Sequence, residues 1–325
     1  MPSADAAPPL ATRDPAVDPA RDPARDPGQA LLELRSELDG LDDALHDLVM
    51  RRARVVGELA GLGAKGRVPL RPGREAAILR RLLGRHAGAF PAASLVRVWR
   101  ELIGGMTAVQ RPLRIAVCEG VGGSGQFLAA SREHFGALVP MHQLSTPAQA
   151  LNEVGSGQAV AAVLPLPRED ETAREAWWTA LLHQDARGPR DARGPRAGDA
   201  ARLHVVARLP FWAVRPEGAT GVQAVVVTAA EPDASGDASG NDRSLLGLEL
   251  ALDVSRARLG TALGTAGFAA GAVILRRDAG ADVAYALVDV AGFVAEGDAR
   301  LGTLGSVLRR PVVVGAYAVP VGGSL

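Results

Sequence analysis

Apolar residues between positions 31 and 62 recur at alternating steps of three and four. The series is Leu31, Leu34, Leu38, Leu41, Leu45, Leu48, Val55, Leu59 and Leu62. This spacing places all of them on one face of an α-helix. A helix of about 32 residues would be roughly 48 Å long, too long for a compact domain of about 80 residues. We therefore expect a second polypeptide to cover this face, most simply in a homodimer.

Two shorter helices are predicted after the long one, beyond a loop rich in Gly and Pro. The second helix runs from Arg74 to about His86. Pro91 suits the first turn of a third helix, which continues to Gln110. The inward face of the third helix is expected to consist of Leu95, Trp99, Leu102, Met106 and Val109. Residues 30–111 thus predict an all-α domain of three helices.

The rest of the chain has a different pattern. Residues 112–245 alternate strand and helix patterns, which predicts an α/β domain, and residues 246–325 predict an α+β domain in the order strand, helix, strand, strand, helix, strand. Residues 1–29 repeat Arg-Asp-Pro, and because each proline disfavours helix we expect a disordered lead-in. Low-complexity stretches predict a surface insertion at 185–196 and a flexible loop at 232–242.

Composition narrows the possible functions. The 325 residues are 47% apolar and 22% charged, as in ordinary globular proteins. The 36 basic and 36 acidic residues cancel, so no overall field favours nucleic acid. We find no apolar run of about eighteen residues and no basic-then-apolar leader, so neither a membrane span nor a secretory signal is expected. The single cysteine, Cys118, fits a reducing cytoplasm.

Two basic residues stand out against this background. Arg52 occupies the slot of the helix face after Leu48, where a guanidinium must find an anion or cost several kcal/mol. It either reaches the edge of the helix bundle or an acidic partner, or it binds an anionic ligand. Lys65 is the single lysine of the chain. Its compact ammonium group can approach acceptors that a planar guanidinium cannot. Either this lysine has a specific role, or its being the single lysine of the chain is chance.

Three segments resemble the helices of all-helical, type II chorismate mutases: LLELRSELDGLDDALHDLVMRRA, RPGREAAILRRLL and VRVWRELIGGMTAVQ. The resemblance covers residues 31–110. It implies an interlocked homodimer with two equivalent sites, each of which takes an arginine from the long helix of the partner. The residues that match the site of the family are Arg35, donated by the partner, Arg52, supplied in cis, the pair Arg74 and Glu75, and Gln110.

The family converts chorismate to prephenate in aromatic amino acid biosynthesis, and this chemistry explains the residue types. Chorismate carries two carboxylates and undergoes a Claisen rearrangement, which is pericyclic and needs no nucleophile, metal or organic cofactor. Arginines clamp the carboxylates and select the reactive conformer, a role that the resemblance gives to Arg35, Arg52 and Arg74. A cation, here Lys65, and Gln110 would stabilise charge at the ether oxygen in the transition state.

Four positions affect how closely the site matches that of the family. Glu75 would have to be protonated, or bonded to a substrate hydroxyl, to act beside the ether oxygen. The lysine of the family corresponds to Gly63, so we expect the first helix to end early and Lys65 to take its place. Met106 stands where the family often has serine, which removes one hydroxyl contact. Arg71 stands where some members have aspartate, and we expect it to be an exposed loop cation.

Residues 112–245 resemble the dehydratase domain that follows the mutase in bifunctional prephenate-processing proteins. The glycines of residues 121–126 lack the Lys-Ser/Thr of a phosphate-binding P-loop, so nucleotide binding is not expected. The dehydratase motifs are replaced. Residues 165–169 read Pro-Leu-Pro-Arg-Glu where the family has Pro-Ile-Glu-Asn-Ser, and residues 211–213 read Phe-Trp-Ala where the family has Thr-Arg-Phe. These losses predict a degenerate dehydratase scaffold.

Residues 246–325 resemble an ACT-type ligand-binding domain. The phenylalanine-binding motifs of such domains are absent, because residues 257–259 read Ala-Arg-Leu and residues 275–278 read Leu-Arg-Arg-Asp. A structural or dimerising role is therefore expected for this segment.

The leading interpretation is a cytoplasmic, homodimeric chorismate mutase that binds chorismate and has neither a nucleic-acid nor a membrane partner. A working bifunctional chorismate mutase/prephenate dehydratase is one alternative. A catalytically silent, chorismate-binding regulatory protein is another. An isochorismate pyruvate lyase and a helical dimerisation module without a ligand remain as further alternatives.

Overall fold

In the computed structural model the chain divides into two units, Met1–Val55 and Val56–Leu325. The residues that it describes are 26–62, 68–184, 202–214, 221–236, 240–304 and 308–322. Within these residues no helix combines the length and the apolar character that a membrane span requires.

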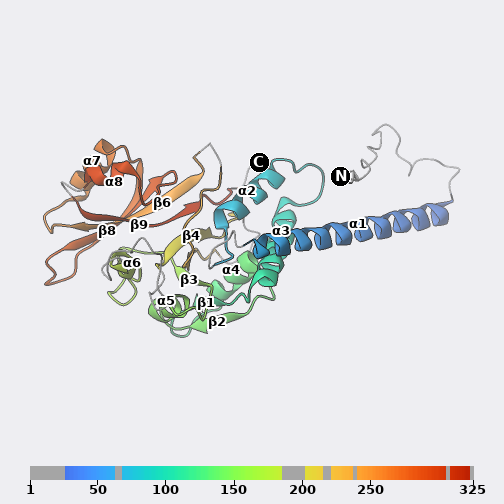
Figure 1. The fold of residues 1–325 in the computed structure, drawn as a ribbon, viewed down its shortest axis with the longest axis horizontal. Helices are drawn as coiled ribbons and strands as arrows, with labels where there is room; N and C mark the ends of the chain where they lie inside the picture. Colours follow the sequence, from blue (N-terminus) through green and yellow to red (C-terminus); the bar gives the residue numbers. More distant parts are fainter. Residues whose placement is uncertain are drawn as a thin grey trace. The chain divides into compact units, whose positions relative to one another are not determined.

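The first helix, α1, comprises Pro27–Gly61 and is 35 residues long (Figure 1), which confirms the long helix predicted from the leucine spacing. It begins inside the segment predicted to be disordered up to residue 29, so that prediction is wrong for its last residues. Asp26 explains the early start, because its carboxylate accepts a hydrogen bond from the Gly28 amide at 3.1 Å. Pro27 fits the first turn, where the amide that it lacks would have no helical partner.

The apolar face of α1 is exposed within this chain. None of the helix residues is buried, and the exposed fractions of Leu38, Leu45 and Leu48 are 60%, 60% and 61%. Monomeric soluble proteins rarely leave a continuous apolar stripe of this length in water. The face is therefore available for another polypeptide.

The second and third helices lie close to their predicted positions. Helix α2 comprises Pro72–Leu83 and helix α3 comprises Ala92–Gln110. The start of α2 is two residues earlier than expected because Pro72 occupies its first turn. Pro91 caps α3 rather than opening it.

The buried face of α3 differs from the predicted one. The residues of α3 that are buried are Val96, Arg100, Ile103, Gly104, Met106 and Thr107. Of the predicted inward residues, Val109 is 66% exposed, while Leu95, Trp99 and Leu102 are only half-buried. The difference arises because α3 packs against α2 and α4 through a face that includes a charged residue, which hydrophobic periodicity does not reveal.

The remaining elements form one nine-stranded sheet with helices. Its strands are β1 (Ile115–Cys118), β2 (Met141–Leu144), β3 (Ala161–Pro165), β4 (His204–Leu209), β5 (Ala224–Thr228), β6 (Asp242–Leu250), β7 (Ala270–Arg276), β8 (Ala284–Ala291) and β9 (Arg309–Ala318). Their order in the sheet is β2-β1-β3-β5-β4-β9-β6-β8-β7. The helices are α4 (Gln126–Phe135), α5 (Pro147–Gly155), α6 (Trp178–Leu182), α7 (Arg256–Thr265) and α8 (Ala299–Leu304). The predicted change from helices to an α/β pattern is confirmed.

The last six elements follow the predicted order of strand, helix, strand, strand, helix, strand, from β6 through α7, β7, β8 and α8 to β9. The sheet nevertheless continues across the domain boundary predicted at residue 245. Strand β9 pairs with β4 in parallel at Val205 and Gly315. Any Cβ on Gly315 would meet the Val205 backbone, so this junction requires glycine.

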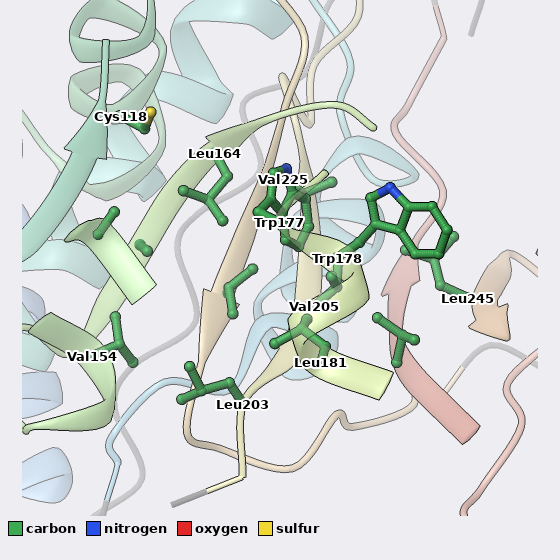
Figure 2. Close-up of a cluster of buried hydrophobic side chains, with 14 of the residues drawn as sticks. Cys118, Val154, Leu164, Trp177, Trp178, Leu181, Leu203, Val205, Val225 and Leu245 are labelled. Atoms are coloured by element: carbon green, nitrogen blue, oxygen red, sulfur yellow. The ribbon is translucent and has the colours of Figure 1, made fainter. Parts of the chain in front are cut away.

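The largest core cluster lies against one face of this sheet. Figure 2 shows Trp177 and Trp178 packed beside Leu164, Val205 and Val225. The Trp178 side chain is completely buried, and its indole nitrogen donates a hydrogen bond to Glu171 at 2.6 Å. A second cluster covers the β6, β8 and β9 region beneath α7 and α8.

Helix α3 is fixed to the end of α4 by a close backbone contact. A Cβ added at Gly104 would collide with the Phe135 carbonyl oxygen, whereas one added at Gly105 would meet no atom within 4 Å. The neighbouring Glu101 carboxylate accepts the Ala137 amide at 3.0 Å. Helix α3 is thus built into the α/β part of the chain.

Two alanine substitutions test this contact. We expect Gly104→Ala to lower the free energy of unfolding by about 1–3 kcal/mol, the usual cost of overpacking. Gly105→Ala should raise it by about 0.5–1 kcal/mol, because alanine has the higher helix propensity. Urea denaturation of both variants measures the difference. Equal effects of the two substitutions would contradict the packing of α3 on α4.

Candidate functional site

The two arginines predicted on the long helix lie in α1. Arg35 is exposed, whereas Arg52 is half-buried, and burial lowers the pKa of the Arg52 guanidinium. They are 17 positions apart, which corresponds to about 25 Å along a helix axis. Arg35 and Arg52 of a single chain therefore cannot contact the same small diacid at the same time. Any site that uses both must therefore combine α1 from two copies.

The Arg74-Glu75 pair lies in the first turn of α2, and its two side chains have different environments. Arg74 is exposed. Glu75 Oε2 accepts a hydrogen bond from Arg100 Nη1 at 2.9 Å. The side chains of Glu75 and Arg100 are only 13% and 5% exposed. The structure thus makes Glu75 part of a buried ion pair that the sequence did not predict.

The electrostatics of Glu75 are set by burial and by two neighbours. Burial raises the pKa of the Glu75 carboxyl, the Arg100 guanidinium opposes this shift, and the charge of Asp233 adds to it. A carboxyl with a raised pKa binds a proton more readily, and its protonated form can donate a hydrogen bond to an ether or hydroxyl oxygen. In the structure Glu75 is nevertheless the carboxylate partner of Arg100, whose guanidinium opposes protonation.

Gln110 lies at the far end of α3 from this ion pair. It is ten residues after Arg100, about 15 Å along the helix axis, and its side-chain amide donates a hydrogen bond to the Met106 carbonyl at 3.1 Å. The structure therefore does not bring Gln110 beside Glu75. The neighbouring Thr107 is buried and donates its hydroxyl to the Ile103 carbonyl at 2.9 Å, so this hydroxyl is engaged within the helix.

Lys65 and Gly63 lie outside the residues that the structure describes. That Lys65 replaces the lysine of the family, which corresponds to Gly63, remains a prediction.

Asp233 was missed by the sequence prediction, and it holds the start of α2. Its carboxylate accepts hydrogen bonds from the backbone amides of Gly73 and Arg74 and from the Arg71 side chain. Arg71 is exposed, as expected for a loop cation, and it also forms an ion pair with Asp233. Asp233 belongs to the segment predicted to be a flexible loop, an expectation that fails for this residue. The only sequence signal was an Asp-Ala-Ser run that cannot reveal a contact across 160 positions.

Phe211 contributes a second contact to the two shorter helices. It is buried, and the guanidinium carbons of Arg80 and Arg100 lie 5.9 Å and 5.1 Å from its ring centroid. In a cation–π contact the electrons of the aromatic ring attract a guanidinium that lies above the ring face. Phe211 is one of the residues found where dehydratases have Thr-Arg-Phe, and here it supports α2 and α3.

Residues of the 165–169 segment, which replaces the other dehydratase motif, are also engaged in structural contacts. The Pro165 carbonyl accepts the Trp177 indole hydrogen bond at 3.2 Å. Arg168 pairs with Asp170 at 3.1 Å, and Glu169 pairs with Arg256. These contacts connect the 165–169 segment with Trp177, Asp170 and helix α7.

The glycine-rich loop after β1 is closed by an acidic residue of the chain. Glu119 accepts hydrogen bonds from the Gly125 amide at 3.1 Å and from the Leu128 amide at 2.5 Å. These amides belong to the N-terminus of α4, where an anion would otherwise be favoured. A carboxylate of the protein therefore takes the position that a phosphate or carboxylate ligand would need.

Comparison with known proteins locates one family within the chain. Residues 34–111 match the family model for chorismate mutase type II. This segment contains nearly all of α1 and the whole of α2 and α3. Residues 34–111 are therefore similar to type II chorismate mutases, and the α/β sheet region follows them.

The chain is also similar to longer, two-function proteins. It is 30% identical over 162 residues to a bifunctional chorismate mutase/prephenate dehydratase of Stutzerimonas stutzeri, a match covering 48% of this chain and 44% of the relative. The corresponding protein of Neisseria gonorrhoeae is 33% identical over 147 residues, covering 44% of this chain and 39% of that protein. The matches thus span less than half the length of these relatives. Among solved structures, a prephenate dehydratase from Streptococcus mutans aligns with a TM-score of 0.42 and 14% identity, over 63% of this chain and 98% of that chain.

Proposed function

We propose that this protein is a homodimeric chorismate mutase, which isomerises chorismate to prephenate. The observation that carries the proposal is the match of residues 34–111 to the type II family, because this segment includes all six residues predicted to form the site. The reaction is intramolecular, so the protein has to bind one conformer and stabilise one transition state.

Substrate binding is assigned to arginines. A guanidinium can hold a carboxylate through two parallel hydrogen bonds, which fixes both its position and its orientation. Arg52 and Arg35 are proposed to clamp the two carboxylates of chorismate, and Arg74, which is exposed at the start of α2, provides a further cation. Held in this way, the reacting ends of the substrate spend more time within bonding distance.

The transition state is proposed to be stabilised at the ether oxygen. Lys65 and Gln110 would donate hydrogen bonds to this oxygen as the C–O bond breaks. Glu75, which is the carboxylate partner of Arg100, is instead proposed to accept a hydrogen bond from a hydroxyl of the substrate. Because Gln110 lies about 15 Å along α3 from the Glu75-Arg100 pair, the proposal requires it to reach the substrate from the opposite end.

A second copy of the chain is proposed to complete each site. The exposed leucine face of α1 needs a cover, and a two-fold dimer provides the same face from a partner. The separation of Arg35 and Arg52 by about 25 Å leads to the same requirement. In an interlocked dimer, Arg35 of one copy can approach the site that contains Arg52 of the other.

The region after residue 111 is proposed to lack dehydratase activity. In support, Phe211 is held beneath Arg80 and Arg100, and Glu119 fills the anion position at the start of α4. A working bifunctional enzyme would need hydroxyl-bearing and anion-binding groups where residues 165–169 and 211–213 now make structural contacts. The ACT-like segment is proposed to have a structural or dimerising role.

The test follows chorismate by its absorbance in the presence of the purified full chain, and then measures prephenate and phenylpyruvate separately at neutral pH. We expect chorismate to disappear faster than without protein and prephenate to accumulate without phenylpyruvate. Loss of chorismate at only the uncatalysed rate would refute the mutase proposal and favour a silent binding protein. Formation of phenylpyruvate would establish the bifunctional alternative, and pyruvate release from isochorismate would indicate the lyase.

A further inference from the structure

Helix α2 lacks an N-terminal cap of its own. The cap position is occupied by Arg71, whose side chain makes no capping hydrogen bond. The amides of the first helical turn have no partners within the helix and need acceptors from elsewhere. Side chains of Ser, Thr, Asp or Asn at the cap position usually supply them, and their loss costs about 0.5–2 kcal/mol. Arginine cannot accept, so the acceptor for α2 has to come from another part of the chain.

Asp233 supplies this acceptor from the segment that precedes β6. Its Oδ1 accepts the Gly73 amide at 2.9 Å, and its Oδ2 accepts the Arg74 amide at 3.2 Å. The same Oδ2 pairs with Arg71 Nε at 3.1 Å. The Asp233 side chain is only 16% exposed, so these hydrogen bonds are shielded from water. An aspartate about 160 positions away in sequence thus performs the role of a local cap.

The segment that carries Asp233 is itself fixed. The Ser235 amide donates a hydrogen bond to Asp242 Oδ2 at 3.0 Å, and the Ser235 hydroxyl accepts one from Arg80 Nη1 at 2.8 Å. Gly73 packs so closely on this segment that a Cβ would collide with the Asp233 carbonyl oxygen. Asp233 is therefore held between the first turn of α2 and the first residue of β6.

The cap acts on the two α2 residues that are assigned to the substrate site. The Arg74 backbone amide donates a hydrogen bond directly to Asp233, and Glu75 is the next residue along the chain. The charge of Asp233 also contributes to raising the pKa of the Glu75 carboxyl. The helix turn that carries both side chains is thus bonded to a residue outside the segment that matches the mutase family.

We propose that Asp233 is a positioning residue of the mutase site, and that the region after residue 111 is needed to complete that site rather than being a separate appendage. The inference rests on the proposed mutase activity for its catalytic part. The capping contact itself does not depend on that activity. A fragment restricted to the family match would lack the cap of α2.

The test compares full-length Asp233→Ala and Asp233→Asn with a control, Asp253→Ala. Asp253 is 77% exposed and lies 3.7 Å from Arg258, so its removal should change little. We expect Asp233→Ala to lower kcat by about 10- to 100-fold, as misplaced catalytic groups do, with KM changed less than threefold. Asp233→Asn keeps one acceptor and should recover part of kcat. A purely structural role would lower the amount of folded protein without this selective change in kcat.

Amide hydrogen exchange provides a second measurement, which does not depend on enzymatic activity. In the wild-type chain, the Gly73 and Arg74 amides should be protected, and Asp233→Ala should make both exchange faster while Asp253→Ala leaves them unchanged. Unchanged protection in Asp233→Ala would refute the cap. Faster exchange with wild-type kcat would refute the positioning role. If the wild-type chain has no turnover, the mutase proposal fails while the exchange result still decides the cap. If Asp233→Ala does not fold, Asp233→Asn decides both points by the same criteria.

Discussion

Replacement of Arg52 by alanine is expected to lower kcat/KM for chorismate by about 100- to 1000-fold. Loss of one partner from a desolvated charge pair costs about 3–4 kcal/mol, and each 1.36 kcal/mol corresponds to a factor of ten. Arg52 is half-buried, so water does not readily replace the lost contact with the substrate carboxylate. Initial rates measured over a range of chorismate concentrations give the effect.

Arg51 provides a matched control for this experiment. It has the same side chain on the adjacent position of α1 and is exposed. Arg51→Ala should keep kcat/KM within about twofold of wild type, since surface substitutions of this kind are nearly neutral. Arg52→Lys should fall between wild type and Arg52→Ala, because lysine keeps the charge but loses the bidentate geometry. Equal activity of Arg51→Ala and Arg52→Ala would remove Arg52 from the site.

The second large effect is expected on stability. Arg100→Leu should lower the free energy of unfolding by about 3–5 kcal/mol, because it leaves the buried Glu75 carboxyl without its ion-pair partner. The same substitution at Arg97, which is exposed on α3, should change stability by less than about 0.5 kcal/mol. The double variant Glu75→Leu/Arg100→Leu should recover much of the loss, because it buries no unpaired charge. Urea denaturation measures all three variants.

The penalty of Arg100→Leu should also depend on pH. Burial raises the pKa of Glu75 in the folded state, and removal of the opposing guanidinium raises it further. The penalty is full above this raised pKa, where the folded chain holds an unpaired carboxylate. It should shrink as the pH falls towards the ordinary pKa of glutamate, because the folded state then gains the proton more favourably than the unfolded state. A penalty that is constant with pH, or a stability loss below 1 kcal/mol, would contradict the buried ion pair.

Periodicity was sufficient to predict the helices but not the partners of their side chains. The leucine spacing located α1 to within a few residues, because a long regular pattern is the strongest sequence signal for a helix. The same periodicity was right about Met106, which is buried, but wrong about Val109, which is exposed on α3. Its buried side includes Arg100, and apolar periodicity treats an arginine as a surface residue even when Glu75 lies opposite.

Contacts between distant parts of the sequence could not be predicted at all. The cap of α2 by Asp233 joins residues about 160 positions apart, and Asp233 lies in a run that resembles a flexible loop. Phe211 was noted only as a departure from a dehydratase motif, whereas its packing under Arg80 and Arg100 depends on the fold. Candidate site residues such as Arg35 and Gln110 came from family resemblance, and their assembly around a substrate remains a proposal.

The most direct test of a site shared between two copies is complementation between Arg35→Ala and Arg52→Ala. Each variant alone should be nearly inactive. When the two are co-expressed and assemble at random, half of the dimers should be mixed, and each mixed dimer should have one site with both arginines intact. We expect about one quarter of wild-type activity for the mixture, as two-fold symmetry requires. Mixed dimers that show no more activity than either variant alone would contradict a mutase site built from two chains.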